Sequence, residues 1–93
     1  MRYFAPGWRG SLDKAYAAAD ALCRLDPTNA VAYRLLGHVA INRRQPQEAL
    51  AHLRHAHEMN PNDTETLRML AWAENNVGLT ADARRHAELT LRL

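Results

Sequence analysis

Residues 30–63 read AVAYRLLGHVAINRRQPQEALAHLRHAHEMNPND, and this stretch decides the fold of the chain. In its first half, Tyr33, Leu36, Gly37 and Ala40 follow the i, i+3, i+4, i+7 spacing. That spacing places side chains on one face of an α-helix. The first half of the stretch is therefore predicted to be an amphipathic helix.

The second half carries the signals of another helix. Pro46 stands where this helix begins, because the first helical residue has no partner for its N–H and proline lacks one. Ala49, Leu53 and Ala56 then form an apolar stripe, and Asn60-Pro61 ends it. The stretch thus predicts a helical hairpin with helices over residues 28–44 and 47–59.

The same pattern repeats when the sequence is shifted by 34 residues. Pro27 then falls on Pro61, and Ala15 and Ala83 fall on Ala49. Three more columns are Ala19, Leu53 and Ala87; Leu22, Ala56 and Thr90; and Leu25, Met59 and Leu93. In a sixth column, Arg44 stands between Gly10 and Gly78. The period predicts three further helices, over residues 11–25, 63–77 and 80–92.

Local signals mark the ends of the predicted helices. Asn62 and Glu65 have the spacing of a capping box, and Gly78 is a natural helix stop. Thr80 is predicted to cap the last helix, with Asp82 in its first turn. Near the amino terminus, Pro6-Gly7 is expected to discourage helix within residues 1–9.

Small residues in the repeated columns predict close helix packing. Gly37 and Ala71 are expected where two antiparallel helices touch, since a larger side chain would push the helices apart. Ala49, Ala56 and Ala83 are expected to do the same on the second helices. The chain is therefore predicted to be an all-α solenoid of helical hairpins.

These residues resemble the tetratricopeptide repeat, whose 34-residue pattern is W-x2-L-G-x2-Y…A-x3-F…P. The resemblance implies a right-handed superhelix in one domain, residues 1–93, with a partial repeat at 10–29, a full repeat at 30–63 and a nearly full one at 64–93. Glu74 departs from the pattern, because the family usually has an aromatic there. The implied structural positions are Pro27, Tyr33, Leu36, Gly37, Ala49, Leu53, Ala56, Pro61, Leu67, Leu70, Ala71 and Ala83.

The family resemblance also implies a function, the binding of a protein or peptide in a concave groove. The groove positions it assigns are Arg34, His38, Asn42, Arg68, Trp72, Asn75 and Asn76. Two arginines in one column beside an indole suit an acidic segment. The carboxylate clamp for chaperone tails is not expected, because Leu35, His38 and Met69 occupy its polar or basic positions.

Two other interpretations stay open. The chain is expected to be a piece of a longer protein, or to self-associate through exposed repeat ends. Its alternative role is a regulatory or oligomerising segment of a bacterial multidomain signalling enzyme, such as a nucleotide cyclase, or of a transcription regulator. RNA binding by a helical repeat is less favoured, because the arginines do not cluster in one stripe.

Composition and motifs argue against several other classes of protein. A net charge of +2, with charged residues dispersed along the chain, does not favour nucleic acid as a partner. Cys23 stands alone, which predicts a cytoplasmic protein without an intramolecular disulfide. Its column, shared with His57 and Leu91, predicts packing rather than catalysis. Neither a membrane span nor a catalytic or cofactor-binding motif is present, so no enzyme and no cofactor are expected.

Glu48, His52 and His55 form the one line of potential metal ligands on a predicted helix. Two imidazoles alone make an incomplete zinc site, since catalytic zinc normally has three protein ligands. We therefore expect a solvated helix face there and no metal site.

Overall fold

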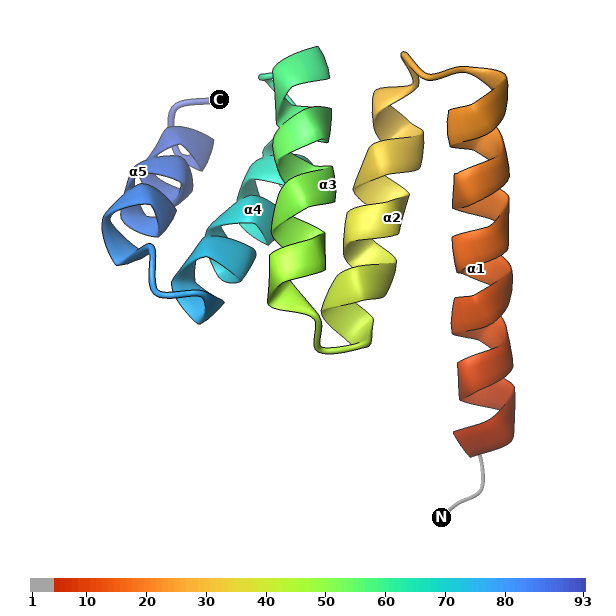
Figure 1. Cartoon of the computed structure of the whole chain (residues 1–93). Coiled ribbons are helices and arrows are strands. Elements are labelled where there is room, and N and C mark those ends of the chain that lie inside the picture. The colour runs from red at the N-terminus through yellow and green to blue at the C-terminus, as the bar shows by residue number, and fades with distance from the viewer. Residues whose placement is uncertain (1–4) are drawn as a thin grey trace.

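The computed structural model describes the backbone of residues 5–93 and the side chains of residues 12–93. Its helices, in chain order, are α1 (Ala5–Leu25), α2 (Ala30–Asn42), α3 (Pro46–Met59), α4 (Thr64–Asn76) and α5 (Thr80–Thr90). Successive helices run antiparallel and are joined by short turns (Figure 1). Residues 5–93 contain no β-strand, which confirms the predicted all-α class.

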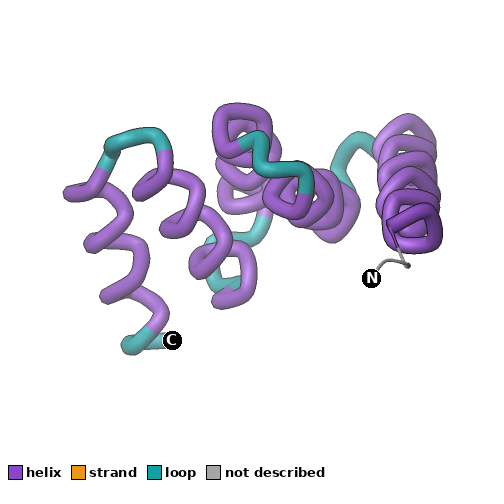
Figure 2. The backbone as a smooth tube through the Cα atoms, turned by 90° about the horizontal axis from the view of Figure 1, so that it is seen from below, coloured by secondary structure: helices purple, strands orange, loops and turns teal. Residues whose placement is uncertain are grey.

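The helices stack in sequence order, each against its neighbours. α2 packs against α1 and α3, α4 packs against α3 and α5, and α4 also touches α2. Seen from below, α1 to α3 are viewed nearly end-on while α4 and α5 are viewed obliquely (Figure 2). The successive hairpins are therefore rotated relative to one another, as in a helical solenoid.

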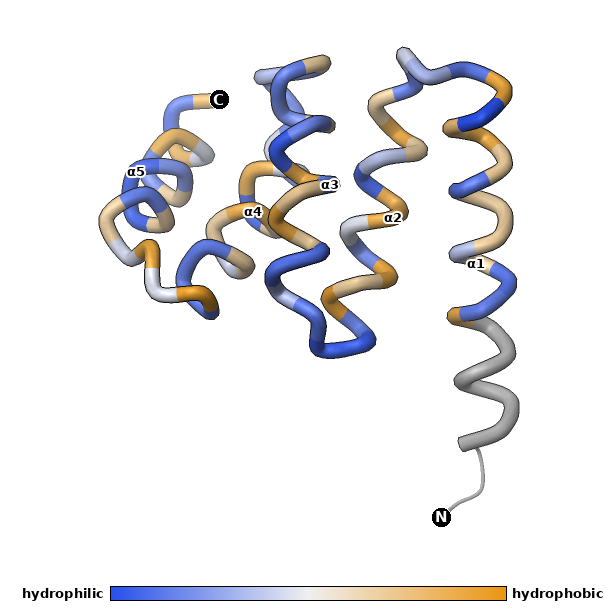
Figure 3. The backbone as a smooth tube through the Cα atoms, in the orientation of Figure 1, coloured by the Kyte–Doolittle hydropathy of each residue, from blue (hydrophilic) through white to orange (hydrophobic). Residues whose placement is uncertain are grey.

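The main apolar core lies where α2, α3 and α4 meet. Its buried members are Ala40, Ala49, Leu50, Leu53, Met69, Leu70 and Ala73. Apolar residues recur along each described helix between hydrophilic ones (Figure 3), as expected for helices that bury only one side.

Burial within one 34-residue column differs from helix to helix. Ala49 and Leu53 are fully buried on α3, whereas in the same columns Ala15 and Ala87 are exposed and Ala19 and Ala83 are buried. Only Ala83 is buried on α5. A residue in a stack is covered by helices on both sides only in the middle, so equal residue type does not produce equal burial.

The turns before α2 and α4 repeat one design. In each, proline follows a polar residue at Asp26-Pro27 or Asn60-Pro61, and the turn leads into a capping side chain. Asn29 Oδ1 accepts a hydrogen bond from the Ala32 amide at 3.2 Å. The Asp63 carboxylate accepts hydrogen bonds from the Glu65 amide at 3.1 Å and the Thr66 hydroxyl at 3.0 Å.

Asp63 therefore caps α4, and the prediction of a capping box from Asn62 to Glu65 is wrong by one residue. The prediction that Thr80 caps α5 is also wrong, because Leu79 precedes the helix without a side-chain cap and Thr80 is its first residue. Asp82 does lie in the first turn of α5, and Pro46 is the first residue of α3. Several residue types are common at helix caps, so backbone geometry decides which of two neighbouring residues becomes the cap.

The expectation that Pro6-Gly7 discourages helix is wrong, because α1 begins at Ala5. Proline in the first turn removes an N–H that has no intrahelical partner, so it costs no hydrogen bond there. α1 is joined to α2 by Arg43, whose Nη2 lies 2.7 Å from Asp13 Oδ1. The same guanidinium lies 5.2 Å from the centre of the Tyr16 ring.

α2 and α4 end in the same way. The amides of Gln45 and Leu79 donate to the carbonyls five residues earlier, those of Ala40 at 2.9 Å and Glu74 at 2.8 Å. The residue before each donor has a positive φ, which is 60° at Arg44 and 93° at Gly78. This is the geometry of a Schellman-type helix end. Arg44 thus adopts the conformation that glycine adopts in the next repeat.

Candidate binding surface on α2 and α4

Three of the predicted groove residues meet in one pocket between α2 and α4. The pocket has a volume of about 320 Å³, and its lining residues are His38, Ile41, Glu65, Arg68, Met69 and Trp72. Trp72 is 37% exposed, so its indole is neither fully solvated nor absorbed into the core. The structure thus brings His38, Arg68 and Trp72 together.

This pocket has an apolar lining with a polar edge. Ile41 packs against the core, Met69 belongs to it, and Trp72 adds an aromatic surface. Glu65 and Arg68 supply opposite charges beside these side chains. Apolar pockets with a few polar groups accept an apolar side chain and orient it. Tryptophan and arginine are also enriched among the residues that dominate binding energy.

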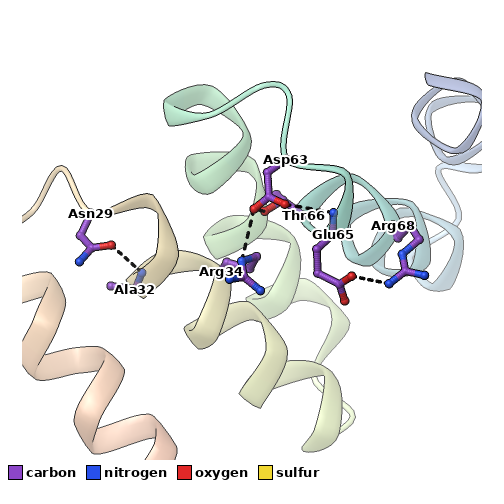
Figure 4. A network of polar contacts seen from close by, with 7 residues as sticks. All are labelled: Asn29, Ala32, Arg34, Asp63, Glu65, Thr66 and Arg68. Atoms are coloured by element: carbon purple, nitrogen blue, oxygen red, sulfur yellow. Dashed lines mark hydrogen bonds and ion pairs between the residues drawn. The ribbon is translucent and has the colours of Figure 1, made fainter. Parts of the chain in front are cut away.

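Arg34 lies outside this pocket and serves the fold. Its Nε is 3.3 Å from Asp63 Oδ2, and both side chains are only 27% exposed (Figure 4). The Nε atom is buried and makes no hydrogen bond of good geometry, so the contact is an ion pair. Because Asp63 caps α4, Arg34 ties α2 to the start of α4.

Arg68 has a different environment, although it shares a column with Arg34. It pairs with Glu65, one turn earlier on the same helix (Figure 4). The Arg68 side chain is 66% exposed. An exposed pair at this spacing contributes only about 0.2–0.5 kcal/mol. A ligand carboxylate can therefore replace Glu65 at little cost.

The predicted asparagines bind their own helices. Asn42 Nδ2 donates to the His38 carbonyl at 2.9 Å, and Asn76 Nδ2 donates to the Trp72 carbonyl at 2.8 Å. Each side chain therefore uses one N–H on its own helix, which leaves its second N–H and its Oδ1 atom as the groups open to a ligand.

Asn75 lines a second pocket, between α4 and α5. Its volume is about 600 Å³, and its lining residues are Arg68, Ala71, Trp72, Asn75, Thr80, Ala83, Arg84 and Ala87. Arg68 and Trp72 line both pockets. These two side chains therefore separate the α2–α4 pocket from the α4–α5 pocket.

The two histidines of the predicted Glu48–His52–His55 line on α3 have different surroundings. The His55 ring lies 4.1 Å from the Tyr33 ring, centre to centre. Burial lowers the pKa of His52, against the opposing influence of Glu48. Within residues 12–93, no group of three histidine, cysteine or acidic side chains is placed to hold a metal ion. Cys23 is half-buried. Its burial raises the pKa of its thiol, and the nearby Asp20 raises it further to a smaller extent.

Sequence reasoning missed a polar cluster that joins α3, α4 and α5. Glu74 is buried, and its Oε1 lies 2.7 Å from His86 Nδ1. His57 meets the His86 ring edge-on at 5.4 Å between centres. The departure of Glu74 from the expected aromatic was the available signal, but nothing in the local sequence indicated its partners.

Comparison with known proteins identifies the repeat. Residues 30–73 match the tetratricopeptide repeat family, and they span α2, α3 and most of α4. The chain contains a tetratricopeptide repeat. Tetratricopeptide repeats generally mediate protein–protein interaction, and they do so as scaffolds. The chain matches no curated protein. In the described part of the chain, every helix is too short or too polar to cross a membrane.

Proposed function

We propose that this tetratricopeptide repeat protein binds a protein or peptide segment along α2 and α4, as a scaffold without catalytic activity of its own. The observation that carries the proposal is the α2–α4 pocket, where the half-exposed Trp72 lies beside Ile41 and Met69. An apolar side chain of the partner fills this pocket. Each such side chain, when buried, contributes about 1.5–3 kcal/mol.

Arg68 adds a charge preference to the pocket. Its only ion-pair partner among the described residues is the neighbouring Glu65, and that pair is weak because it is exposed. A partner carboxylate adjacent to the apolar anchor replaces Glu65 and forms a charge-assisted hydrogen bond. Arg34 contributes less to this preference than its column suggests, because Asp63 already holds it.

Peptide selection on the protein tests this proposal. A random twelve-residue display library is selected on the wild-type chain, and the enriched peptides are measured by isothermal titration calorimetry. We expect peptides that combine a large apolar residue with an acidic one. Trp72→Ala should weaken them about tenfold or more, the effect typical of an interface hot spot.

Two variants complete the test. Arg68→Glu should shift the selection from acidic toward basic peptides, because it reverses the charge at the pocket edge. Arg54→Ala, on the exposed surface of α3 and outside the described pockets, is the matched control and should leave affinity unchanged. Enriched peptides that bind Trp72→Ala as tightly as wild type would refute the proposed site.

A further inference from the structure

Within the Glu74–His86–His57 cluster, Glu74 occupies a position that is apolar in the preceding repeat. Shifted by 34 residues, Glu74 corresponds to Ala40, a fully buried core residue. The Glu74 side chain is 2% exposed and that of His86 is 14% exposed. A buried carboxylate is costly unless it is paired. His86 therefore supplies the interaction that makes Glu74 tolerable at this position.

The contact has particular weight because α5 packs against a single helix, α4, and buries few residues of its own. α3 buries Ala49, Leu50, Leu53 and Ala56, whereas α5 buries only Ala83. The hydrogen bond from α5 to Glu74 adds a polar link to its packing on α4, and the ring contact with His57 links α5 to α3. Segments with few buried apolar contacts are the first to open in a folded protein.

Within the cluster, His57 is poorly placed to gain a proton. Nδ1 of His57 is buried without a hydrogen-bond partner. Burial lowers the pKa of His57, as does His86 on α5, while Glu74 on α4 and Glu58 on α3 oppose the change. The other charged groups around the adjoining cavity, of about 350 Å³, are Arg85, Glu88 and Arg92 on α5. Arg85 is also paired with Asp82 at 3.0 Å.

We propose that Glu74, His86 and His57 form an acid-sensitive latch that holds α5 against α3 and α4. The Glu74 carboxylate lies 2.7 Å from His86 Nδ1 and holds that ring in place. A proton added to His57 has no hydrogen-bond acceptor at Nδ1, and the resulting charge lies against the His86 ring. Mild acid therefore releases α5 while the α2–α3 hairpin stays folded.

Amide hydrogen exchange of the full chain, corrected for the intrinsic effect of pH, tests the latch. Between pH 7.5 and pH 5, we expect protection in α5 to fall about fivefold or more relative to protection in α2. His57→Gln cannot take up this proton and should keep α5 protected at pH 5. Glu74→Gln removes the carboxylate that favours a proton on His57 and that contacts His86, so α5 should open at a higher pH than in wild type.

The matched control is His52→Gln, which removes another partly buried histidine of α3 that lies outside this cluster. Its α5 should respond to acid as in wild type. If His57→Gln lowers overall stability, His57→Leu provides the same test with an apolar side chain. The latch is refuted if α5 in wild type loses no more protection than α2, or if neither His57 variant reduces the response of α5.

Discussion

Gly37 on α2 lies directly against Leu53 on α3. A Cβ atom placed on Gly37 would lie 2.5 Å from both Cγ and Cδ2 of Leu53, closer than any ordinary carbon contact. Leu53 is fully buried and belongs to the core shared by α2, α3 and α4. α2 and α3 can therefore approach this closely only because residue 37 has no side chain.

Gly37→Ala should destabilise the chain despite the better helix propensity of alanine. The propensity gain is about 1 kcal/mol, but overpacking typically costs about 1–3 kcal/mol. Leu53 Cγ is close to the backbone and cannot move as freely as a chain end. We expect a net loss of up to about 2 kcal/mol, measured by urea unfolding. In a Leu53→Ala background the same substitution should cost nothing, so an equal loss in both backgrounds would contradict the contact.

Arg44→Gly should stabilise the chain. Arg44 has a φ of 60°, and a residue with a Cβ pays about 1 kcal/mol or more in this region. Part of the gain is lost because glycine has more freedom when unfolded, so we expect about 0.5–1 kcal/mol. The reciprocal control is Gly78→Ala, which meets no atom within 4 Å but imposes the strain. A melting temperature that falls in Arg44→Gly would show that its side chain outweighs the backbone.

Arg34 and Arg68, which share a repeat column, should have different roles. Substitution of Arg34 should lower stability, whereas substitution of Arg68 should weaken binding. Arg34→Ala leaves the half-buried Asp63 without its ion pair, and we expect a loss of about 0.5–1 kcal/mol. Arg68→Ala removes only an exposed pair and should change stability by less than about 0.5 kcal/mol. Calorimetry with the selected acidic peptides should show the larger loss of affinity in Arg68→Ala. The reverse ranking in either measurement would contradict the assignment.

The stability of the whole chain should fall in mild acid, in part through His52. Burial lowers the pKa of His52 below its ordinary value of 6.5 in the folded chain, so the unfolded chain binds more protons in that range. Stability is then complete above about pH 6.5 and declines as pH falls toward the folded pKa. Urea titrations at pH 7.5 and pH 5 should show a smaller difference in His52→Gln. An unchanged difference would contradict this contribution.

The sequence by itself determined the helices and their repeated order. The spacing of Tyr33, Leu36, Gly37 and Ala40, with the following prolines, predicts the α2–α3 hairpin, because helical hydrogen bonds and turn geometry depend on neighbours a few residues away. The 34-residue shift extended this prediction to α4 and α5. Individual cap residues were predicted less well, as Asp63 and Leu79 show, since several adjacent positions satisfy the same local rule.

The candidate site was only partly accessible from the sequence. Helical spacing places Arg68 and Trp72 near each other on α4, and repeat alignment brings in His38 from α2. The alignment also assigned the same role to Arg34 and Arg68, which the structure gives different partners. Asp63 reaches Arg34 from a different helix, and no periodicity within α2 encodes that approach.

Tertiary structure alone decided which equivalent residues are buried and which polar groups meet. Ala49 is buried and Ala15 is exposed in one column, because α3 lies between α2 and α4 whereas α1 packs against α2 alone. His57, Glu74 and His86 come from three helices and meet through the rotation of one hairpin on the next. Hydrogen bonding within a helix is local and can be inferred from a short stretch of sequence. Burial and charge pairing depend on distances between helices, which exist only once the stack has formed.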